Sequence, residues 1–427
     1  LDGPEPLRTA AGDAALTAVD MLIAEGNGAE AAAICDALRK ADVADHIHIA
    51  ALHGAIRALG DDGLPRLAEC LQSDNRDVFR VGLGMANEIG GPEAAKLLID
   101  ALELPSDGDS HPRAALLIYA LGDLGERTAL PIVLKAAENA APDVRQAAIR
   151  ALGLLGDASA VEVLLAAAVD DEALSSAARE SLADLEGEEV DAAIAKAFDT
   201  AEGNKRLVLI GLIGDRGIAA AVPALKQAAG DEDLEVATAA IKALSTTIEL
   251  DELSVLIDLL VSSASAEKSA AAKEALKIAV LRMPDRDATS VKLLAPMDDA
   301  SATGKVNLLD LLGIVGGEKA LKGVAAAARS GDDAAQDAAT RVLGGWMSPD
   351  AAPVLLELAK AGPEKFRIRC LRGFIRIPRQ FDVSLQGRIA MCRDAMAAAT
   401  RDAEKALVLE VLGRNQSPET LAEVPPY

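Results

Sequence analysis

Residues 149–157 read Ile-Arg-Ala-Leu-Gly-Leu-Leu-Gly-Asp, and shorter versions of this stretch recur along the chain. They read Ile-Arg-Ala-Leu-Gly at 56–60, Ile-Lys-Ala-Leu at 241–244, Arg-Val-Leu-Gly at 341–344 and Glu-Val-Leu-Gly at 410–413. Aligning the copies on the residue before the small-Leu-Gly element, or before its nearest equivalent, gives twelve positions, 27 to 38 residues apart: Arg57, Gly84, Tyr119, Arg150, Glu180, Val208, Lys242, Lys277, Asp310, Arg341, Arg372 and Glu410. Repetition at this spacing indicates an array of repeats, each packed mainly against its neighbours.

Each repeat reads as a pair of helices. The first helix follows a turn that carries Gly and Asp, as at 156–158 and 214–216, and often has proline near its start, where a missing N–H needs no partner. These prolines are Pro65, Pro92, Pro131, Pro223, Pro353 and Pro418. The second helix follows an acidic turn and places apolar residues on one face, as Val144, Ala148, Ile149 and Leu152 illustrate. The chain is therefore predicted to be an all-α solenoid of about twelve helix pairs.

Glycine stands three residues after the aligned position in seven of the twelve copies: Gly60, Gly122, Gly153, Gly211, Gly313, Gly344 and Gly413. Glycine inside a helix costs roughly 1 kcal/mol relative to alanine, so its recurrence at one position needs a structural reason. We expect a neighbouring helix to approach closely at these glycines.

The repeats are predicted to form one solenoid over residues 1–427. Within it, we expect residues 1–40 to be N-terminal capping helices and 360–393 to be a basic, aromatic-containing repeat, and 415–427 to be the C-terminal end, with truncation left open. The chain begins Leu-Asp-Gly-Pro without an initiating Met, which is typical of either a fragment or a processed product. The compartment therefore stays open, with an exported or periplasmic location slightly favoured over a cytoplasmic one.

The composition favours helices with small side chains at their contacts. Half of the 427 residues are apolar, 51%, but only 2% are aromatic, which disfavours β-structure. The formal net charge of -24 would repel phosphate backbones and anionic bilayers, so nucleic-acid binding is not expected. Charged residues interrupt every apolar stretch well before the ~18 positions that a membrane span needs, so membrane insertion is not expected either.

The second helix at 143–153 resembles the HEAT-repeat family, particularly the short bacterial form that also occurs in phycobilin lyases. Its sequence is Asp-Val-Arg-Gln-Ala-Ala-Ile-Arg-Ala-Leu-Gly, and Gly-Asp followed by Ala-Leu-Pro or Ala-Val-Pro recurs around it. The resemblance covers about residues 40 to 420 and implies structural roles, through bonds across repeats, for the following residues: Asp143, Arg145, Asp77 with Arg80, and Arg367. The copies around 245–300 depart from the pattern, because Ser-Thr-Thr at 245–247 replaces the Gly-containing turn.

The end of the chain has a second resemblance. The segments 370–376, 391–396 and 406–413 look like the HEAT segments of large exported proteins of environmental bacteria. Such segments often accompany a carbohydrate-active or cytochrome-like domain, so the likeness implies an exported, multidomain setting.

The sequence lacks the residues that three candidate enzyme classes would require. The metal-dependent hydroxylases among HEAT-like proteins hold two irons with His-Glu pairs, by resemblance, but none of His46, His48, His53 and His111 is followed by Glu. Bilin lyases would need an aromatic pocket, and Trp346 is the one tryptophan of the sequence. No Gly-x-Ser-x-Gly turn occurs. We therefore expect no enzyme, no catalytic residue, no cofactor and no bound metal.

The four cysteines, Cys35, Cys70, Cys370 and Cys392, have none of the short paired spacings that hold zinc or perform dithiol chemistry. Buried residues or free thiols are the favoured interpretation, with a disulfide as the alternative. The histidines are interpreted as surface or interhelix residues, because among the three at 46–53 only His46 and His53 could share a helical face.

Residues 360–393 are basic in an otherwise acidic chain. Nine cationic residues occur there, Lys360, Lys365, Arg367, Arg369, Arg372, Arg376, Arg379, Arg388 and Arg393, against Glu364 and Asp382. A helix starting near Pro363 would place four of them on one stripe, Lys365, Arg369, Arg372 and Arg376, with Phe366, Cys370, Leu371 and Phe374 opposite. The stripe, with Trp346, is the candidate partner-binding site for an acidic protein or a carboxylate-bearing ligand. Pairing with acidic residues on adjacent helices is the alternative that we favour.

Together these features predict a non-enzymatic HEAT-like scaffold whose concave face, lined by the second helices, binds another protein or a companion domain. The alternative is an accessory segment of an exported carbohydrate-active or redox enzyme whose catalytic domain is absent from this chain.

Overall fold

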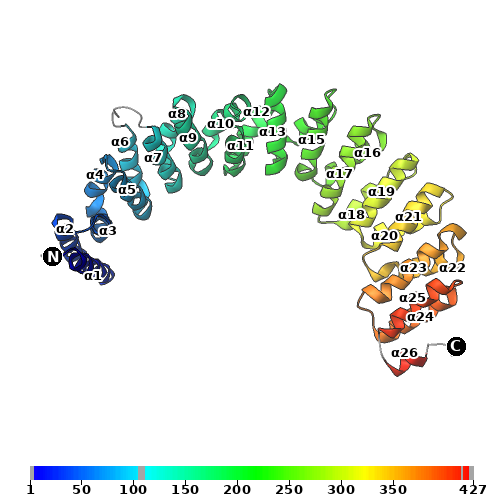
Figure 1. The fold of residues 1–427 in the computed structure, drawn as a ribbon. Helices are drawn as coiled ribbons and strands as arrows, with labels where there is room; N and C mark the ends of the chain where they lie inside the picture. Colours follow the sequence, from blue (N-terminus) through cyan, green and yellow to red (C-terminus); the bar gives the residue numbers. More distant parts are fainter. Residues whose placement is uncertain (1–3, 104–110, 415–416, 423–427) are drawn as a thin grey trace. The chain divides into compact units, whose positions relative to one another are not determined.

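The computed structural model describes residues 4–103, 111–414 and 417–422, and within them the chain forms helices and no strand (Figure 1). The predicted all-α solenoid is confirmed. In the part of the chain that the structure describes, twelve consecutive helix pairs run from α2 and α3 to α24 and α25, with α1 before them and α26 after them. Of the predicted C-terminal end at 415–427, only 417–422 belongs to the described residues.

The helices group into two compact units, an N-terminal unit of residues 1–212 and a C-terminal unit of residues 213–427. The helices of the N-terminal unit are α1 (Glu5–Ala24), α2 (Gly28–Lys40), α3 (Asp45–Leu59), α4 (Leu64–Gln72), α5 (Arg76–Ile89), α6 (Gly91–Glu103), α7 (His111–Leu124), α8 (Leu130–Asn139), α9 (Pro142–Leu155), α10 (Val161–Asp170), α11 (Ser175–Asp184) and α12 (Glu188–Asp199). Helix α13 (Gly203–Arg216) contains the boundary between the units.

The helices of the C-terminal unit are α14 (Val222–Ala229), α15 (Leu234–Thr247), α16 (Leu253–Ser262), α17 (Ala266–Arg282), α18 (Arg286–Leu294), α19 (Ala302–Val315), α20 (Gly317–Ala328), α21 (Asp333–Gly344), α22 (Ala352–Ala361), α23 (Glu364–Gln380), α24 (Leu385–Ala398), α25 (Asp402–Gly413) and α26 (Pro418–Ala422). Short 3-10 helices lead into several first helices: η1 (Gly60–Gly63), η2 (Arg127–Ala129), η3 (Ala158–Ala160), η4 (Ala219–Ala221), η5 (Leu250–Glu252) and η6 (Pro349–Ala351).

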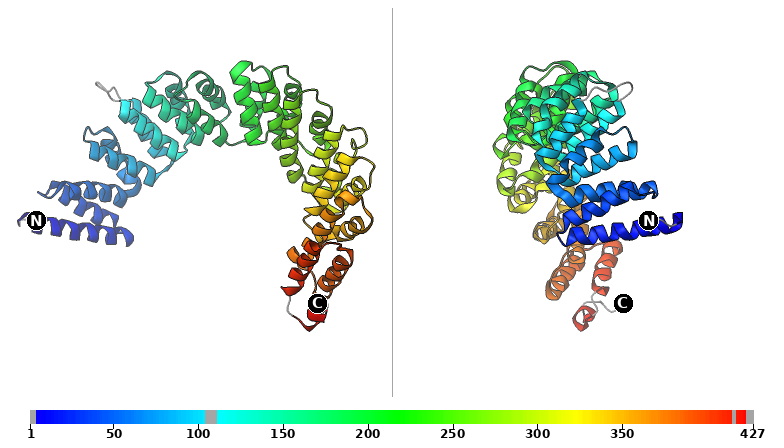
Figure 2. Two further views of the ribbon diagram at one scale, coloured as in Figure 1. Left: turned by 45° about the vertical axis from the view of Figure 1, so that its right-hand side comes forward. Right: turned by 90° about the vertical axis from the view of Figure 1, so that its left-hand side faces the viewer.

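Within each unit the helices form two layers. The second helices of the pairs, which carry odd numbers, pack on one another, as α7 on α9 and α9 on α11, or α19 on α21 and α21 on α23. The even-numbered first helices form the other layer, as α4 with α6 and α22 with α24. Figure 2 shows the stacked pairs from two further directions. Each helix therefore buries one face against its own partner and one edge against the next repeat.

Local sequence explains where the helices begin. All six prolines singled out above lie at the first or second residue of a helix, in α4, α6, α8, α14, α22 and α26, as predicted. Other helices begin with a side-chain cap. The Asn75 side-chain oxygen accepts from the backbone N–H groups of Asp77 and Val78 at the start of α5, and Asp332 accepts from those of Ala334 and Ala335 at the start of α21.

The core is built from alanine, leucine and other small or aliphatic side chains. In α9, the predicted apolar face is buried, with Ala148, Ile149 and Leu152 inaccessible to solvent and Val144 nearly so. All four cysteines are buried thiols, which agrees with the favoured interpretation. Burial raises the pKa of Cys35, Cys70 and Cys370 to about 11, so these three thiols are packing residues that carry no charge at neutral pH.

Close helix contacts occur at three of the predicted glycines. A Cβ atom on Gly122 would lie 2.9 Å from the Ala151 Cβ, and one on Gly153 would lie 2.9 Å from the Ser181 Cα. A Cβ on Gly313 would lie 2.7 Å from a Val342 methyl group. These contacts join successive second helices, α7 to α9, α9 to α11 and α19 to α21.

At the other predicted glycines the expectation is wrong or needs correction. Gly211 and Gly413 face open space among the described residues, and Gly60 has a positive φ of 56° at a helix end. In α13 the close contact is made by Gly214 instead, where a Cβ would lie 3.0 Å from the Ala243 Cα. At Gly344 the contact comes from the next repeat, because a Cβ on Gly373 would lie 2.9 Å from its Cα.

Candidate functional site

Helix α23 of the C-terminal unit carries the predicted basic stripe. It begins at Glu364, directly after Pro363, and runs to Gln380. Its apolar side, Phe366, Cys370, Leu371 and Phe374, is buried. Lys365, Arg369 and Arg372 are exposed and Arg376 is half-buried, so the helix separates its charges from its core contacts as the spacing predicts.

The first half of the stripe pairs with α21, which is the second helix of the preceding repeat. The Lys365 Nζ lies 2.8 Å from the Asp333 Oδ1, and the Arg369 Nη1 lies 2.8 Å from the Asp337 Oδ1. The same Arg369 nitrogen donates to the hydroxyl of buried Thr340 at 3.1 Å. Both cations also lie over the ring of Phe366, at 4.8 and 5.3 Å from its centre.

The second half of the stripe contacts α25, which is the second helix of the following repeat. The Arg372 Nε donates to the Glu404 Oε1 at 2.9 Å, and Arg401 donates to both oxygens of Glu404, at 2.6 and 2.8 Å. Although Glu404 is a carboxylate, its side chain is only 1% exposed. The hydrogen bonds from Arg401, with a further contribution from Arg372, outweigh burial and lower the pKa of Glu404 to about 2.

A second carboxylate on α25, that of Glu410, lies near two arginines in a more exposed arrangement. The Glu410 Oε1 lies 2.5 Å from the Arg414 Nη2 and 3.9 Å from the Arg379 Nη2. All three side chains remain close to half exposed. Water therefore screens these pairs much more than it screens the buried Glu404.

Arg376 is held by neutral groups. Its guanidinium donates to the backbone carbonyls of Gly344 at 3.0 Å and Trp346 at 2.5 Å, and to the Gln380 side-chain oxygen at 2.6 Å. Among the described residues no carboxylate pairs with Arg376. Trp346 is itself buried, with 4% of its surface exposed, so its backbone carbonyl positions Arg376 while its indole belongs to the core.

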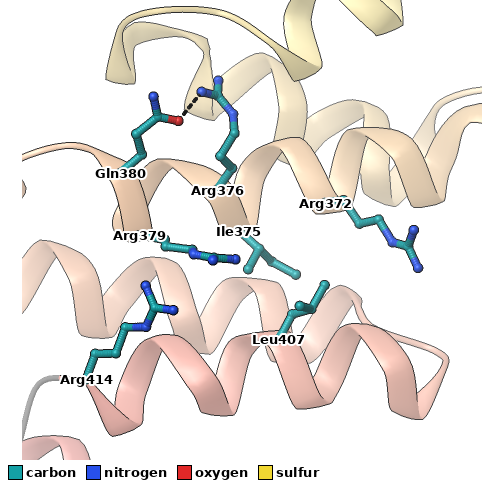
Figure 3. Close-up of a pocket in the computed structure, with 7 residues that line it drawn as sticks. All are labelled: Arg372, Ile375, Arg376, Arg379, Gln380, Leu407 and Arg414. Carbon is teal, nitrogen blue, oxygen red and sulfur yellow. Dashed lines mark hydrogen bonds between the residues drawn. The ribbon is translucent and has the colours of Figure 1, made fainter.

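A hollow of about 380 Å³ lies between α23 and α25 and is lined by Arg372, Ile375, Arg376, Arg379, Gln380, Leu407 and Arg414. Figure 3 shows the Arg414 side chain extending from the end of α25 toward α23, where the Arg379 side chain lies along the helix, with Ile375 and Leu407 facing each other beside them. We call this hollow the arginine pocket.

The contact residues on α25 were not predicted from the sequence. Glu404 shares one helical face with the buried residues Val408, Val411 and Leu412, so an acidic residue on an apolar face is the signal that could have identified it. Arg379 lay within the basic stretch but outside the predicted stripe, and Arg414 lies beyond that stretch.

Similar charge pairs link other second helices of the C-terminal unit. Asp310 on α19 lies 3.0 Å from the Arg341 Nη2 on α21 and 3.6 Å from the Lys273 Nζ on α17. The layer of second helices therefore carries a ladder of alternating charges, and α23 is its most basic member.

Comparison with known protein families identifies the repeat. A model described as HEAT repeats matches residues 106–183 and 190–277. These residues carry HEAT repeats. The predicted resemblance to the HEAT-repeat family is confirmed over these residues, the predicted all-α solenoid is confirmed as well, and the fold is that of a helical repeat scaffold.

Several solved structures match over much of the chain. Human deoxyhypusine hydroxylase in complex with glycerol is 17% identical, over 74% of this chain and 96% of that chain, with a TM-score of 0.26. Kap95p, described with RanGDP, is 14% identical over 95% of this chain and 59% of that chain, with a TM-score of 0.42. Kap121p bound to Nup53p is 14% identical over 89% of this chain, with a TM-score of 0.44. The chain spans 44% of that Kap121p chain, so it covers about half the length of these two proteins. A comparison with curated protein sequences found no match.

The HEAT signature residues make some of the bonds that the resemblance implies. Arg145 donates to Asp171 in the next repeat at 3.1 Å and to the Ala137 carbonyl at 3.2 Å. Arg367 donates to the Gly362 carbonyl at 2.7 Å, within its own repeat. Asp143 is exposed at the start of α9, and Asp77 lies in the first turn of α5, three residues before Arg80.

In the irregular HEAT copy at 245–247, α15 continues to Thr247. There the Thr246 hydroxyl donates to the Gly214 carbonyl of α13 at 2.6 Å, so a side chain replaces the predicted turn glycine at the contact between repeats.

Three histidines lie between helices or against the backbone of the HEAT array. The His46 Nε2 lies 3.9 Å from Asp13 on α1, and the His53 Nε2 lies 3.2 Å from Glu88 on α5. His48 bonds the Ala41 carbonyl at 2.9 Å, while the side chain of His111 is outside the described residues. In the described part of the chain, no three His, Cys, Asp or Glu side chains are placed to hold a metal ion. None of the described helices has both the length and the apolar composition to cross a bilayer.

Proposed function

We propose that this chain is a non-enzymatic HEAT-repeat scaffold that binds another protein, or a companion domain, through the concave face lined by its second helices. Stacked second helices offer an extended surface of side chains, which is what repeat arrays use for binding. The observation that carries the proposal is α23, a strongly basic helix in the second-helix layer of a chain with net charge -24. Its cations are neutralised only in part and remain open to solvent.

Within this face we assign partner contact to the predicted stripe. Lys365, Arg369 and Arg372 keep 50%, 41% and 55% of their side chains exposed despite their ion pairs. The pairs of Lys365 and Arg369 involve exposed carboxylates and contribute little to stability, so an acidic partner could exchange with Asp333 and Asp337 at low cost. Arg376 and, through its backbone carbonyl, Trp346 support the far end of the stripe.

Reversing charges within the stripe tests the proposal, provided that stability is left intact. Arg372→Glu is unsuitable, because it would place a second carboxylate against buried Glu404. Lys365→Glu with Arg369→Glu is better, since their partners Asp333 and Asp337 are exposed. The matched control is Lys322→Glu with Arg329→Glu in the first-helix layer, where both cations pair with exposed glutamates.

We expect the chain to capture a partner from an extract of its native source, and the stripe variant to lose most of that partner. The control variant should retain the partner, and both variants should melt close to the wild-type temperature. Raising the salt concentration should release the partner from the wild type, because the contact is electrostatic. If the stripe and control variants retain equal amounts, the second-helix face is not the binding surface.

A further inference from the structure

We infer that the arginine pocket between α23 and α25 is a peptide-binding site that takes a carboxylate side chain from an acidic segment of a protein partner. This inference rests on the proposed function and adds the place and the chemistry of recognition. It involves residues outside the predicted stripe, since Arg379 and Arg414 are two of the four arginines that line the pocket.

The charge around the pocket exceeds what internal pairing requires. Five arginines gather there, Arg372, Arg376, Arg379, Arg401 and Arg414, against two carboxylates, Glu404 and Glu410, which leaves an excess of three positive charges. A ladder that only neutralised itself would match cations with acids one to one, as Lys365 pairs with Asp333 and Arg369 pairs with Asp337. Like charges held this close repel one another, so the excess favours an anion from outside.

The buried carboxylate of Glu404 does not compete with an incoming anion for the remaining arginine donors. Both oxygens of Glu404 already accept hydrogen bonds, one of them from two arginines. Glu410 occupies one nitrogen of Arg414 and lies 3.9 Å from Arg379, too far for a hydrogen bond. The Arg379 guanidinium therefore has its donors available, and guanidinium groups bind carboxylates through paired N–H donors.

Arg376 is fixed in advance of binding. Three acceptors hold its guanidinium, and none of them carries a charge. Figure 3 shows this guanidinium pointing away from α25, so Arg376 adds positive charge beside the pocket and leaves the ligand contacts to Arg379 and Arg414.

The size and walls of the pocket select a peptide side chain. A volume of about 380 Å³ lies at the small end of ligand sites, which suits one or two side chains better than a large cofactor. Ile375 and Leu407 give the floor an apolar part that can cover the methylene groups of a glutamate or a neighbouring aliphatic residue. The fitting ligand is thus a segment that combines acidic and aliphatic residues.

Fluorescence anisotropy with a defined probe tests the site. The probe is a labelled eight-residue peptide of alternating Glu and Leu, and its partner probe carries Gln in place of Glu. The test variant is Arg379→Gln with Arg414→Gln, because both side chains are about half exposed and should not affect folding. The control is Arg341→Gln, an exposed arginine of the same layer that does not line the pocket.

We expect the wild type and Arg341→Gln to bind the Glu peptide with the same affinity, and the double variant to bind it about 10-fold or more weakly. The Gln peptide should not bind. Equal binding by the double variant and the wild type, or equal binding of the two peptides, would overturn the inference. Displacement of the peptide by an equal concentration of inorganic phosphate would also overturn it, since the pocket would then be a site for free oxyanions.

Failure of the pocket can be told apart from failure of the scaffold proposal. The peptide assay uses purified protein and Arg379 with Arg414, whereas partner capture depends on Lys365 and Arg369. If the peptide assay fails while the stripe variant still loses its partner, the scaffold proposal stands and only the pocket assignment falls.

Discussion

Replacing Gly214 by leucine should lower the free energy of unfolding by ~1 to 3 kcal/mol, whereas the same substitution three residues earlier, at Gly211, should raise it slightly. A Cβ atom on Gly214 would already lie 3.0 Å from the Ala243 Cα, and the rest of a leucine side chain would force α13 and α15 apart. At Gly211 a Cβ atom would meet no described residue within 4 Å. The substitution there only removes a flexible glycine from a helix, which raises the free energy of unfolding by up to ~1 kcal/mol.

Thermal and urea denaturation of the two variants provide the comparison. Gly153→Leu should behave like Gly214→Leu, because its Cβ would lie 2.9 Å from the Ser181 backbone. Since Gly211 and Gly214 belong to one helix, differences in local helix propensity largely cancel. Shifts of the same sign and size at the two positions would show that the glycine contact does not control helix spacing.

Replacing Glu404 by glutamine should cost about 2 kcal/mol of stability near neutral pH. Glutamine keeps the shape but loses the charge, and its amide presents donors toward the donors of Arg372 and Arg401. Breaking a fully buried ion pair typically costs about 3 to 5 kcal/mol, but here both guanidinium groups are about half exposed, so water compensates them in part. The control Glu410→Gln should cost below about 1 kcal/mol, because that pair is open to solvent.

The effect of Glu404→Gln should depend on pH in a defined direction. The folded protein lowers the pKa of Glu404 from its ordinary 4.5 to about 2, so the carboxylate stabilises the fold fully above pH 4.5. That contribution is lost as the pH falls from 4.5 toward 2, where the wild type also becomes protonated. Urea midpoints for the wild type and the variant should therefore converge as the pH falls from about 6 to about 3. A constant difference over that range would show that the ionised carboxylate is not the stabilising group.

Much of the fold followed from local sequence features. The prolines mark helix starts because their geometry suits the first turn, and the apolar spacing of α9 marks its buried face. Both signals act within a few residues and do not depend on the rest of the chain. This is why the twelve pairs could be predicted without knowing how they stack.

The position of the close contact in α13 was less accessible to sequence analysis. Gly211 and Gly214 lie three residues apart on the same helix, and repeats of variable length do not show which of them faces the next repeat. In the structure the contacting residues are 28 or 29 positions apart, as Gly153 and Ser181 or Gly214 and Ala243. Only the packed pair of helices establishes this spacing.

The candidate site was predictable as a basic helix but not as a pocket. The stripe from Lys365 to Arg376 follows from helical periodicity alone. The pocket requires α25 to pack beside α23, so that Arg414 and Leu407 meet residues some 30 positions earlier. Likewise, the burial of Trp346 depends on neighbouring helices, and composition alone gave no reason to place it in the core.

Hydroxyl-radical footprinting of the chain, alone and with the partner captured from its native source, tests the central claim most directly. The account predicts that the partner protects side chains of the second helices in the C-terminal unit, with the strongest protection on α23 and α25 around the arginine pocket. The first helices α20, α22 and α24 should remain as accessible as in the free protein. Protection confined to those first helices would contradict the claim that the second-helix face is the binding surface.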